Sequence, residues 1–300
     1  MFAILSCTQS DCSLLTAILV MAVIGLLLGL IIGIVAKIFK VETDPRIELV
    51  ASLLPNANCG GCGRAGCADF AKAVVAGEVA PNQCPASSQE TVNSIAKALG
   101  IEANASFKKV AVVLCGGDKN QTKNWTLYNG VNDCRSAMLI AGGPKACSYG
   151  CLGMASCARA CPFGAIEIVN GLAIVHSEKC VGCGKCVATC PRKLIKLVPA
   201  DAQVHVYCNN PEKGPAKKKY CNVPCLGCRK CDKNAPGKFT FEGFHAVVNY
   251  EAENLPIVDD LDAIKCPTNC LLSAREHLAI EESNPDHVEL AKENSAADKE

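Results

Sequence analysis

The hydrophobic pattern begins with an apolar run from Leu14 to Ala36, LLTAILVMAVIGLLLGLIIGIVA, which contains no charged residue. As an α-helix this run would span roughly 34 Å, enough to cross the hydrocarbon core of a bilayer. No Lys or Arg precedes the run, so the pattern disfavours a cleaved signal peptide. We therefore predict a transmembrane helix over residues 13–36, preceded by a short extracytoplasmic N-terminus (1–12) and followed by a linker (37–46).

After the linker the pattern changes to short elements. RIELVASLLP, ending at Pro55, has the apolar spacing of a short helix. VAVVL, AIEIV and LAIVH, at 110–114, 165–169 and 172–176, are short runs typical of β-strands. Short helices and strands of this kind predict a small α+β fold for the region after the anchor.

The distribution of charged residues predicts how the chain is oriented in the membrane. The 30 basic and 29 acidic residues nearly cancel, so the bulk charge indicates no nucleic-acid partner. Lys37, Lys40 and Arg46 follow the apolar run, whereas only Asp11 precedes it. The positive-inside rule then predicts a single-pass protein of the cytoplasmic membrane, with its C-terminal bulk facing the cytoplasm.

The 23 cysteines are the main chemical signal. An odd number, arranged in C-x-x-C groups, argues against the paired disulfides of small secreted domains. The sequence contains neither C-x-x-C-H nor a C-x-H arrangement, so covalent haem and a Rieske centre are disfavoured. With these alternatives disfavoured, the cysteines are expected to bind metal as thiolates.

The clearest motif is CVGCGKCVATCP, with Cys180, Cys183, Cys186 and Cys190 before Pro191. This is the bacterial ferredoxin run, in which three closely spaced thiolates bind one [4Fe-4S] cluster and the fourth binds a second cluster. Zinc sites normally use two separated C-x-x-C pairs instead.

A second run, CSYGCLGMASCARACP, supplies the partner motif, but Met154 stands at its second ligand position. A thioether replaces a cluster thiolate poorly, and Cys147 stands four residues before Cys151, so we expect Cys147 to take the vacant position. The two expected ligand sets are Cys147, Cys151, Cys157 and Cys190, and Cys161, Cys180, Cys183 and Cys186.

A third run, CNVPCLGCRKCDKNAPGKF, retains the triple but has Ala235 where the fourth cysteine would stand. Cys266 is followed by Pro267 like a fourth cysteine, but no cysteine triple precedes it. We expect one cluster here, bound by Cys225, Cys228, Cys231 and Cys266, with its partner cluster lost. The alternative is that Cys221 is the fourth ligand.

The loop NCGGCGRAGC matches the dinucleotide pattern G-x-G-x-x-G at Gly61, Gly63 and Gly66. That pattern needs a preceding strand, and the preceding segment reads as a helix. The rest of the chain favours a cluster bound by Cys59, Cys62, Cys67 and Cys84, with zinc as the alternative. No flavin or NAD fingerprint remains, so we expect neither hydride nor acid–base chemistry on this chain.

The second and third runs belong to an internal repeat, in which VVLC parallels HVYC and Cys147 parallels Cys221. The first copy has an additional stretch that contains Trp125 and Cys134. The remaining cysteines are expected to be small buried apolar residues. These are Cys7, Cys12, Cys115, Cys134, Cys208, Cys221 and Cys270.

The order of these features resembles the iron–sulfur B-subunit of Rnf complexes, the ion-translocating ferredoxin:NAD oxidoreductases. The features are one membrane helix followed by NCGGCGRAGC, GGPKACSYGCLGMASCARACPFGAI and CVGCGKCVATCP. The resemblance extends from the anchor to about Leu272. The resemblance implies electron entry from reduced soluble ferredoxin, and flavin- and NAD-binding and membrane subunits as partners. From the four ligand sets we expect four [4Fe-4S] clusters. We expect an N-terminal cluster domain (47–105), a two-cluster ferredoxin-like domain (106–204), a single-cluster unit (205–275) and an acidic tail (276–300).

A basic stretch beside the third run fits such a role. Residues 213–233 carry seven basic side chains against Asp232 alone, which could steer an acidic ferredoxin or form a solvated loop. The basic residues are Lys213, Lys217, Lys218, Lys219, Arg229, Lys230 and Lys233. The alternatives to an Rnf-type protein are a stand-alone polyferredoxin, a corrinoid-linked iron–sulfur reductase and a zinc-dependent scaffold.

Overall fold

The computed structural model describes residues 9–38, 44–102, 108–252 and 254–277. The chain divides into two compact units, Met1–Glu48 and Leu49–Glu300. Parts of the expected N-terminal segment and linker, and the acidic tail from residue 278, lie outside the described residues. The structure confirms an α+β fold preceded by one long apolar helix.

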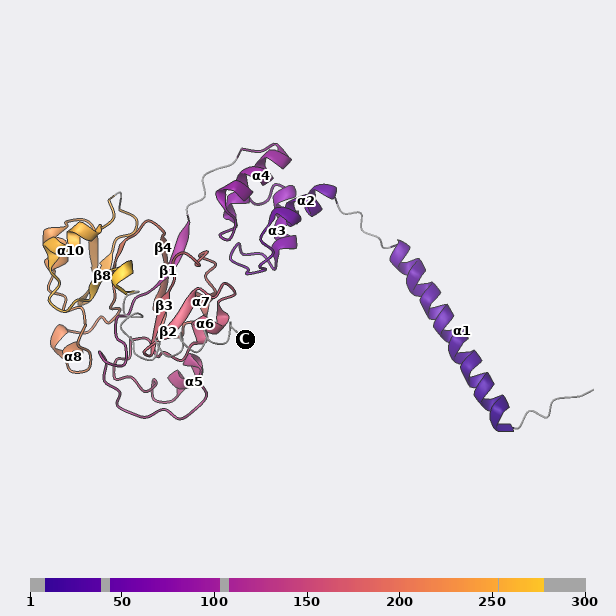
Figure 1. Ribbon diagram of the computed structural model, residues 1–300, viewed down its shortest axis with the longest axis horizontal. Helices are drawn as coiled ribbons and strands as arrows, with labels where there is room; N and C mark the ends of the chain where they lie inside the picture. Colours follow the sequence, from indigo (N-terminus) through magenta and orange to yellow (C-terminus); the bar gives the residue numbers. More distant parts are fainter. Residues whose placement is uncertain (1–8, 39–43, 103–107, 253, 278–300) are drawn as a thin grey trace, which may run out of the picture. The chain divides into compact units, whose positions relative to one another are not determined.

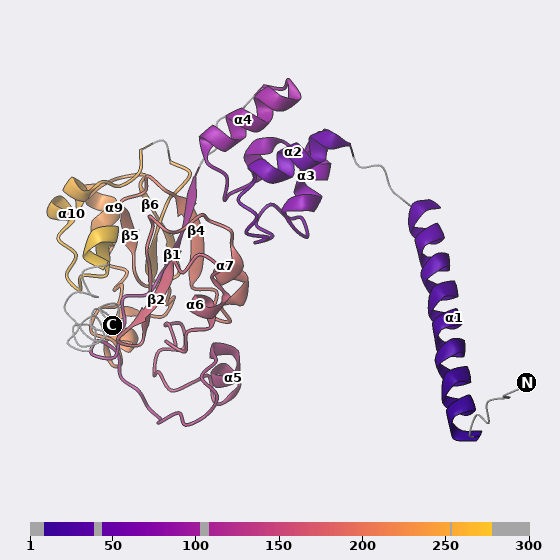
Figure 2. The same cartoon turned by 45° about the vertical axis from the view of Figure 1, so that its right-hand side comes forward.

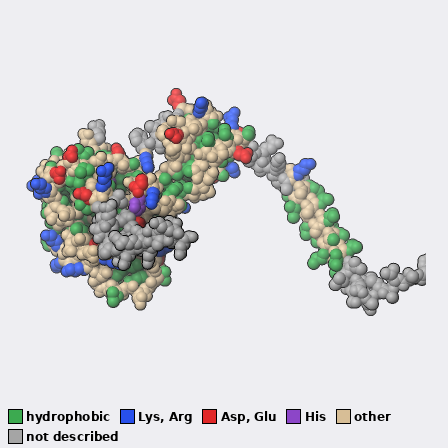
Figure 3. Space-filling view, viewed as in Figure 1, with side chains coloured by type: hydrophobic (Ala, Val, Ile, Leu, Met, Phe, Trp, Pro, Cys, Tyr) green, Lys and Arg blue, Asp and Glu red, His purple; other side chains and the backbone are tan. Residues whose placement is uncertain are grey.

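The first unit contains α1 (Gln9–Ile38), drawn in indigo in Figure 1. Within it, Ala17–Val35 has a mean hydropathy of 3.1, and none of this window is buried by protein. A fully exposed apolar surface of this length is stable in lipid and unfavourable in water. Hydrophobic side chains cover the described part of the helix in Figure 3. The helix therefore indicates membrane association.

The second unit begins with a small helical domain. Its elements are α2 (Pro45–Leu53), α3 (Cys67–Val75), the 3-10 helix η1 (Pro81–Gln83) and α4 (Gln89–Leu99). Ser88 caps α4 by accepting the Thr91 N–H at 3.2 Å, and Gly100 ends that helix in the left-handed conformation. Phe70, Val92 and Ile95 form its buried core. Because α2 precedes the glycine-rich loop, the strand that a dinucleotide site requires is missing, as predicted.

The ferredoxin-like region consists of two copies of one topology. In the first copy, β1 and β4 form an antiparallel pair that encloses the hairpin β2–β3 and two short helices, α6 and α7. Figures 1 and 2 both show α6 and α7 side by side next to these strands. The bounds are β1 (Lys109–Val113), α6 (Ser156–Ala160), β2 (Ile166–Val169), β3 (Leu172–Val175), α7 (Lys185–Thr189) and β4 (Ile195–Pro199).

The second copy repeats this order. β5 pairs with β8, and they enclose the hairpin β6–β7, α9 and α10. The bounds are β5 (Val204–Val206), α9 (Lys230–Asn234), β6 (Phe239–Glu242), β7 (His245–Val248), α10 (Val258–Ile264) and β8 (Leu271–Ser273). Two further helices, α5 (Cys134–Leu139) and α8 (Gly214–Lys218), lie in the connections that precede α6 and α9. The predicted repeat is therefore present in three dimensions.

Each copy has its own hydrophobic core, and cysteines contribute to both. Leu172, Ile174 and Val198 are completely buried in the first core, together with Cys157 and Cys186. The second core contains Phe239, Ile264 and Cys225, all buried. The register of each sheet keeps its apolar side chains facing these cores, because a shift of one residue would turn them to solvent. The cores thus hold the cysteine-bearing loops in fixed positions.

His205 in β5 is a buried titratable group of the second copy. It is 1% exposed, and its Nδ1 forms a 2.9 Å hydrogen bond with the Tyr250 hydroxyl. Burial, and then repulsion from His277, lowers the pKa of His205 to about 4. The folded state therefore binds fewer protons than the unfolded state between about pH 6.5 and pH 4.

We expect the free energy of unfolding to decrease as the pH falls from 8 to 6, because His205 takes up a proton more readily in the unfolded chain. The contribution of His205 to this decrease is about 1 kcal/mol. Thermal unfolding of the anaerobic protein at several pH values would measure this change. His205→Gln should flatten the dependence, since the side chain of Gln does not titrate. An equally steep dependence in this variant would assign the effect to other groups.

Candidate metal centres

Cys161, Cys180, Cys183 and Cys186 line one cavity of about 320 Å³, which corresponds to the expected ferredoxin set. The Ala111 N–H in β1 donates to Cys180 Sγ at 3.3 Å, and the Ala165 N–H donates to Cys161 Sγ at 3.4 Å. Backbone N–H donors to thiolate sulfur stabilise negative charge at a cluster. The structure thus brings all four predicted residues together.

A second cavity of about 370 Å³ is lined by four cysteines, which come from α5, α6, the loop before α6 and the end of α7. They are Cys134, Cys151, Cys157 and Cys190. Burial, followed by repulsion from Cys151, Cys134 and Cys190, raises the pKa of Cys157 to about 12. The structure brings three of the expected ligands together, and the fourth cysteine that lines this cavity is Cys134 rather than the expected Cys147.

Two hydrogen bonds place Cys134. Its backbone N–H donates to Ser156 Oγ at 2.7 Å, and Ser156 Oγ donates to Asp133 Oδ1 at 2.7 Å. Because Ser156 is the first residue of α6, Cys134 is held beside Cys157. Sequence reasoning missed Cys134. Two features of the sequence together could have identified it. Met154 leaves one ligand position without a cysteine, and the additional stretch of the same copy contains one cysteine, Cys134.

The third cavity, of about 400 Å³, lies in the second copy. It is lined by Cys225, Cys228, Cys231 and Cys266, the expected set, and by Cys270. Cys266 closely follows the end of α10, as Cys190 directly follows α7. The Ala246 N–H in β7 donates to Cys225 Sγ at 3.3 Å. Cys221 does not line this cavity, so the geometry favours Cys266 over Cys221 as the fourth ligand.

Cys270 lies beside the four expected ligands of this cavity without being one of them. It is buried, and its Sγ lies 3.6 Å from Cys266 Sγ. The corresponding position in the first copy is Leu194, whose N–H donates to Cys190 Sγ. A thiol in this position donates a weak hydrogen bond to a ligand sulfur, which lowers the pKa of Cys266 to about 5.

In the first cluster domain, a hydrogen bond joins the two ends of the glycine-rich loop 58–67. The Cys67 N–H donates to Asn58 Oδ1 at 2.8 Å, and Gly66 has no room for a side chain because a Cβ there would stand 2.8 Å from the same oxygen. A Cβ on Gly61 would stand 2.8 Å from Pro85 Cγ and 2.9 Å from Cys183 Cα. The loop therefore packs against the residue after Cys84 and approaches the site that contains Cys183.

The spacing of these cysteines fits clusters better than single ions. Among residues that the structure describes, no group of three His, Cys, Asp or Glu is placed to hold one metal ion. Zinc binds sulfur at about 2.3 Å, so its four thiolates lie only about 4 Å apart. A [4Fe-4S] cluster is larger and needs a wider set of thiolates. The residues of the three cavities fit such a group.

Comparison with known proteins supports this conclusion. Residues 54–86 match an iron–sulfur cluster family model, and residues 143–201 match the LdpA Fe-S cluster-binding domain. The B-subunit of an ion-translocating oxidoreductase complex from Methanosarcina acetivorans is 40% identical over 240 residues, which is 79% of this chain and 91% of that protein.

Two bacterial proteins are similar over most of the chain. The B-subunit of the Na(+)-translocating ferredoxin:NAD(+) oxidoreductase complex of Acetobacterium woodii is 40% identical over 86% of this chain and 78% of its own length. The B-subunit of the proton-translocating complex of Clostridium ljungdahlii is 44% identical over 69% of this chain and 74% of its own length. With these matches and its cysteine sites, the chain belongs to the B-subunit family of ion-translocating (Rnf-type) oxidoreductase complexes, as an iron–sulfur electron-transfer subunit.

Proposed function

We propose that this chain receives electrons from reduced ferredoxin and passes them to the flavin- and NAD-binding subunits of an ion-translocating membrane complex. The observation that carries the proposal is the set of three similar cavities, each lined by at least four cysteines that include a ferredoxin-type set. Clusters bound there would supply one-electron transfer. The charge asymmetry around α1 supports a single pass with the cluster domains in the cytoplasm.

Four sets of cysteines would hold [4Fe-4S] clusters. Relative to the sequence prediction, the proposal changes one residue, Cys134 in place of Cys147. The sets are Cys59, Cys62, Cys67 and Cys84; Cys134, Cys151, Cys157 and Cys190; Cys161, Cys180, Cys183 and Cys186; and Cys225, Cys228, Cys231 and Cys266. The cysteines bind the metal, the backbone N–H groups stabilise the thiolates, and the two cores exclude water.

The basic stretch of the second copy provides a surface for an acidic donor. Lys213, Lys218, Lys219, Arg229 and Lys230 are exposed, and Arg229 and Lys230 also line the cavity that contains Cys228. Figure 3 shows Lys and Arg side chains along the side where Figure 1 places α8 and α10, with Asp and Glu side chains among them near α10. Cys228 is itself exposed, so this cavity opens near the basic surface.

Lys217 was wrongly included in this surface. It is completely buried, and its Nζ donates to the Asn210 and Phe244 carbonyl oxygens at 2.9 and 3.0 Å. Replacing it would disturb the core of the second copy rather than the docking surface. A test of docking must therefore use Lys218 and Lys219, whose side chains reach solvent.

We expect reduced ferredoxin to bleach the visible absorbance of the anaerobic full-length chain in stopped-flow experiments at low salt. Lys218→Ala combined with Lys219→Ala should slow this second-order step roughly three- to tenfold, because removal of positive charge weakens electrostatic steering. The effect should diminish as the ionic strength rises. This experiment tests the proposed function and the docking surface together.

The matched control replaces Lys72 and Lys97, two exposed lysines of the first cluster domain, which gives the same change in net charge. If both double variants slow the reaction equally, the basic surface is not the docking site. Absence of any bleaching by ferredoxin, in protein that dithionite does reduce, would contradict the proposed electron donor.

A further inference from the structure

In the two ferredoxin-like copies, four cysteines lie outside the three cavities, and the repeat relates them in pairs. Cys115 follows β1 and Cys208 follows β5, whereas Cys147 and Cys221 each precede the first cysteine of a cluster loop by four residues. Each copy therefore contributes one cysteine after a strand and one before a cluster loop. The structure brings the two pairs to the boundary between the copies.

Two glycines show how closely these sulfurs gather. A Cβ on Gly150 would stand 3.5 Å from Cys147 Sγ and 3.7 Å from Cys115 Sγ. A Cβ on Gly117 would stand 3.7 Å from Cys115 Sγ and 3.8 Å from Cys221 Sγ. Three sulfurs from both copies thus surround two residues without side chains.

Cys208 lies beside the same group. The Gly116 N–H donates to the Tyr207 carbonyl oxygen at 2.9 Å, so Cys115 and Cys208 each adjoin one partner of a hydrogen bond between the two copies. The fold therefore places the cysteine after β5 next to the cysteine after β1. Such proximity would be unfavourable for four thiolates without a positive group between them.

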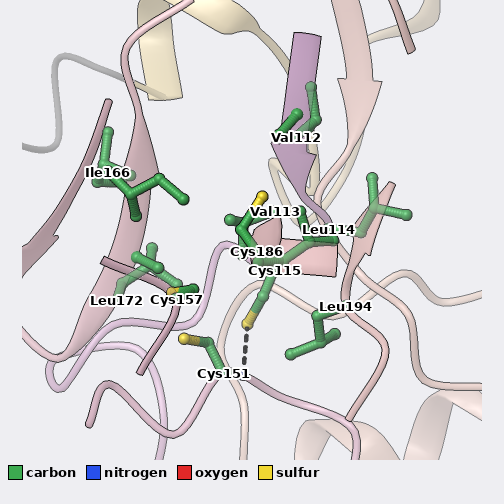
Figure 4. Packing of buried hydrophobic residues seen from close by; sticks show 14 of the residues in the cluster. Val112, Val113, Leu114, Cys115, Cys151, Cys157, Ile166, Leu172, Cys186 and Leu194 are labelled. Atoms are coloured by element: carbon green, nitrogen blue, oxygen red, sulfur yellow. Dashed lines mark hydrogen bonds between the residues drawn. The ribbon is translucent and has the colours of Figure 1, made fainter. Parts of the chain in front are cut away.

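Polar donors point at these sulfurs as they do at the other sites. The Cys151 N–H donates to Cys115 Sγ at 3.4 Å, the contact that Figure 4 marks with a dashed line. In the second copy, the Cys225 N–H makes the equivalent bond to Cys208. The amide of Asn210, which is 2% exposed, donates from the second copy to Cys147 Sγ of the first at 3.7 Å.

Buried cations surround the group. Lys145 is 4% exposed, and its Nζ donates to the carbonyl oxygens of Gly117 and Gly171 at 2.6 and 3.2 Å, as Lys217 does in the second copy. Within the described ranges, no carboxylate forms an ion pair with either lysine. Arg192 donates to the Cys147 carbonyl at 2.8 Å. Buried cations with only neutral partners are costly unless an anionic group lies nearby.

We propose that Cys115, Cys147, Cys208 and Cys221 bind a further [4Fe-4S] cluster at the boundary between the two ferredoxin-like copies. The four thiols would release four protons, and four thiolates with a [4Fe-4S]²⁺ core give a net charge of 2−. One electron from a neighbouring reduced iron–sulfur cluster would change this to 3−. The buried Lys145 and Lys217 and the half-buried Arg192 are the cations that such a charge requires.

The position of this site suggests a role in electron transfer between the two copies, and this role rests on the proposed function. Cys115 contacts the backbone of Cys151, a ligand of the first copy, and Cys208 contacts the backbone of Cys225, a ligand of the second. A cluster here would stand between the single site of the second copy and the paired sites of the first.

The test is the metal content of the anaerobically purified full-length chain after reconstitution with iron and sulfide. We expect about twenty iron and twenty sulfide per chain, in place of about sixteen for four clusters. Combining Cys208→Ser with Cys221→Ser should lower the iron content to about sixteen. The control Cys12→Ser removes a cysteine outside all five sets and should retain about twenty.

The stoichiometry of the unmodified chain decides the question even if the double variant fails to fold. About sixteen iron in the unmodified chain would overturn the inference and leave the proposed function intact. Sixteen iron with one bound zinc would assign the four cysteines to a zinc site and also overturn it. A chain that takes up no iron would contradict both the inference and the proposed function.

Discussion

A chain that carries both Cys134→Ser and Cys157→Ser is expected to lose about four iron atoms, no more than either single variant. The reason is that both cysteines line the same cavity, so the second substitution removes a ligand from a site that is already empty. Iron and sulfide analysis of the three anaerobic proteins would measure this directly.

The combination of Cys147→Ser with Cys157→Ser should behave differently. If Cys147 belongs with Cys115 and Cys221, as the glycine contacts indicate, the two substitutions act on separate sites and remove about eight iron atoms. Loss of only four from this pair would contradict a separate cluster bound by Cys147. If Cys147→Ser alone also loses four, the original sequence prediction is restored, in which Cys147 and Cys157 share a cluster. The double variants thus distinguish the two ligand sets without any assumption about activity.

Gly182→Ala should destabilise the protein by at least about 3 kcal/mol. Gly182 has a φ of +71°, and a Cβ there would stand 2.4 Å from the Lys109 carbonyl oxygen in β1. The alanine would therefore carry both left-handed backbone strain and a collision with the strand. Because Cys180 and Cys183 flank this position, we also expect loss of the cluster that they bind. Thermal unfolding and iron content would report the two effects.

Gly237→Ala is the control for backbone strain alone. Gly237 has a φ of +80°, but a Cβ there would meet nothing within 4 Å. We expect a cost of about 1 kcal/mol and an unchanged iron content. If both glycine variants are equally stable, the close packing of the cluster loop against β1 does not contribute as the structure indicates.

The same glycine occurs in the other two cluster loops. A Cβ on Gly153 would stand 2.4 Å from the Gly171 carbonyl oxygen, and one on Gly227 would stand 2.6 Å from the Phe244 carbonyl oxygen. Each of the three glycines follows the first cysteine of its loop by two residues. The repeated need for close approach explains why CLG occurs twice and CVG once in the sequence.

The sequence alone determined the apolar helix, the short α+β elements, the internal repeat and most of the expected ligands. This was possible because three ligands of a ferredoxin site come from one short loop, where spacing along the chain fixes spacing in space. The placement of Cys266 also followed from the repeat, since α10 replaces α7 and ends close to the equivalent residue.

Only the tertiary structure decided which cysteines from distant segments line each cavity. Cys134 reaches its site because Ser156 anchors it at the start of α6, an arrangement that no local motif encodes. Cys115 and Cys221 both lie beside Gly117 because the two copies pack together, although 106 positions separate these cysteines in the numbering of the chain. Lys217 looked like a surface charge within a basic stretch, yet the fold buries it against two carbonyl groups. Local spacing specifies a loop, whereas contacts between loops depend on how the cores pack.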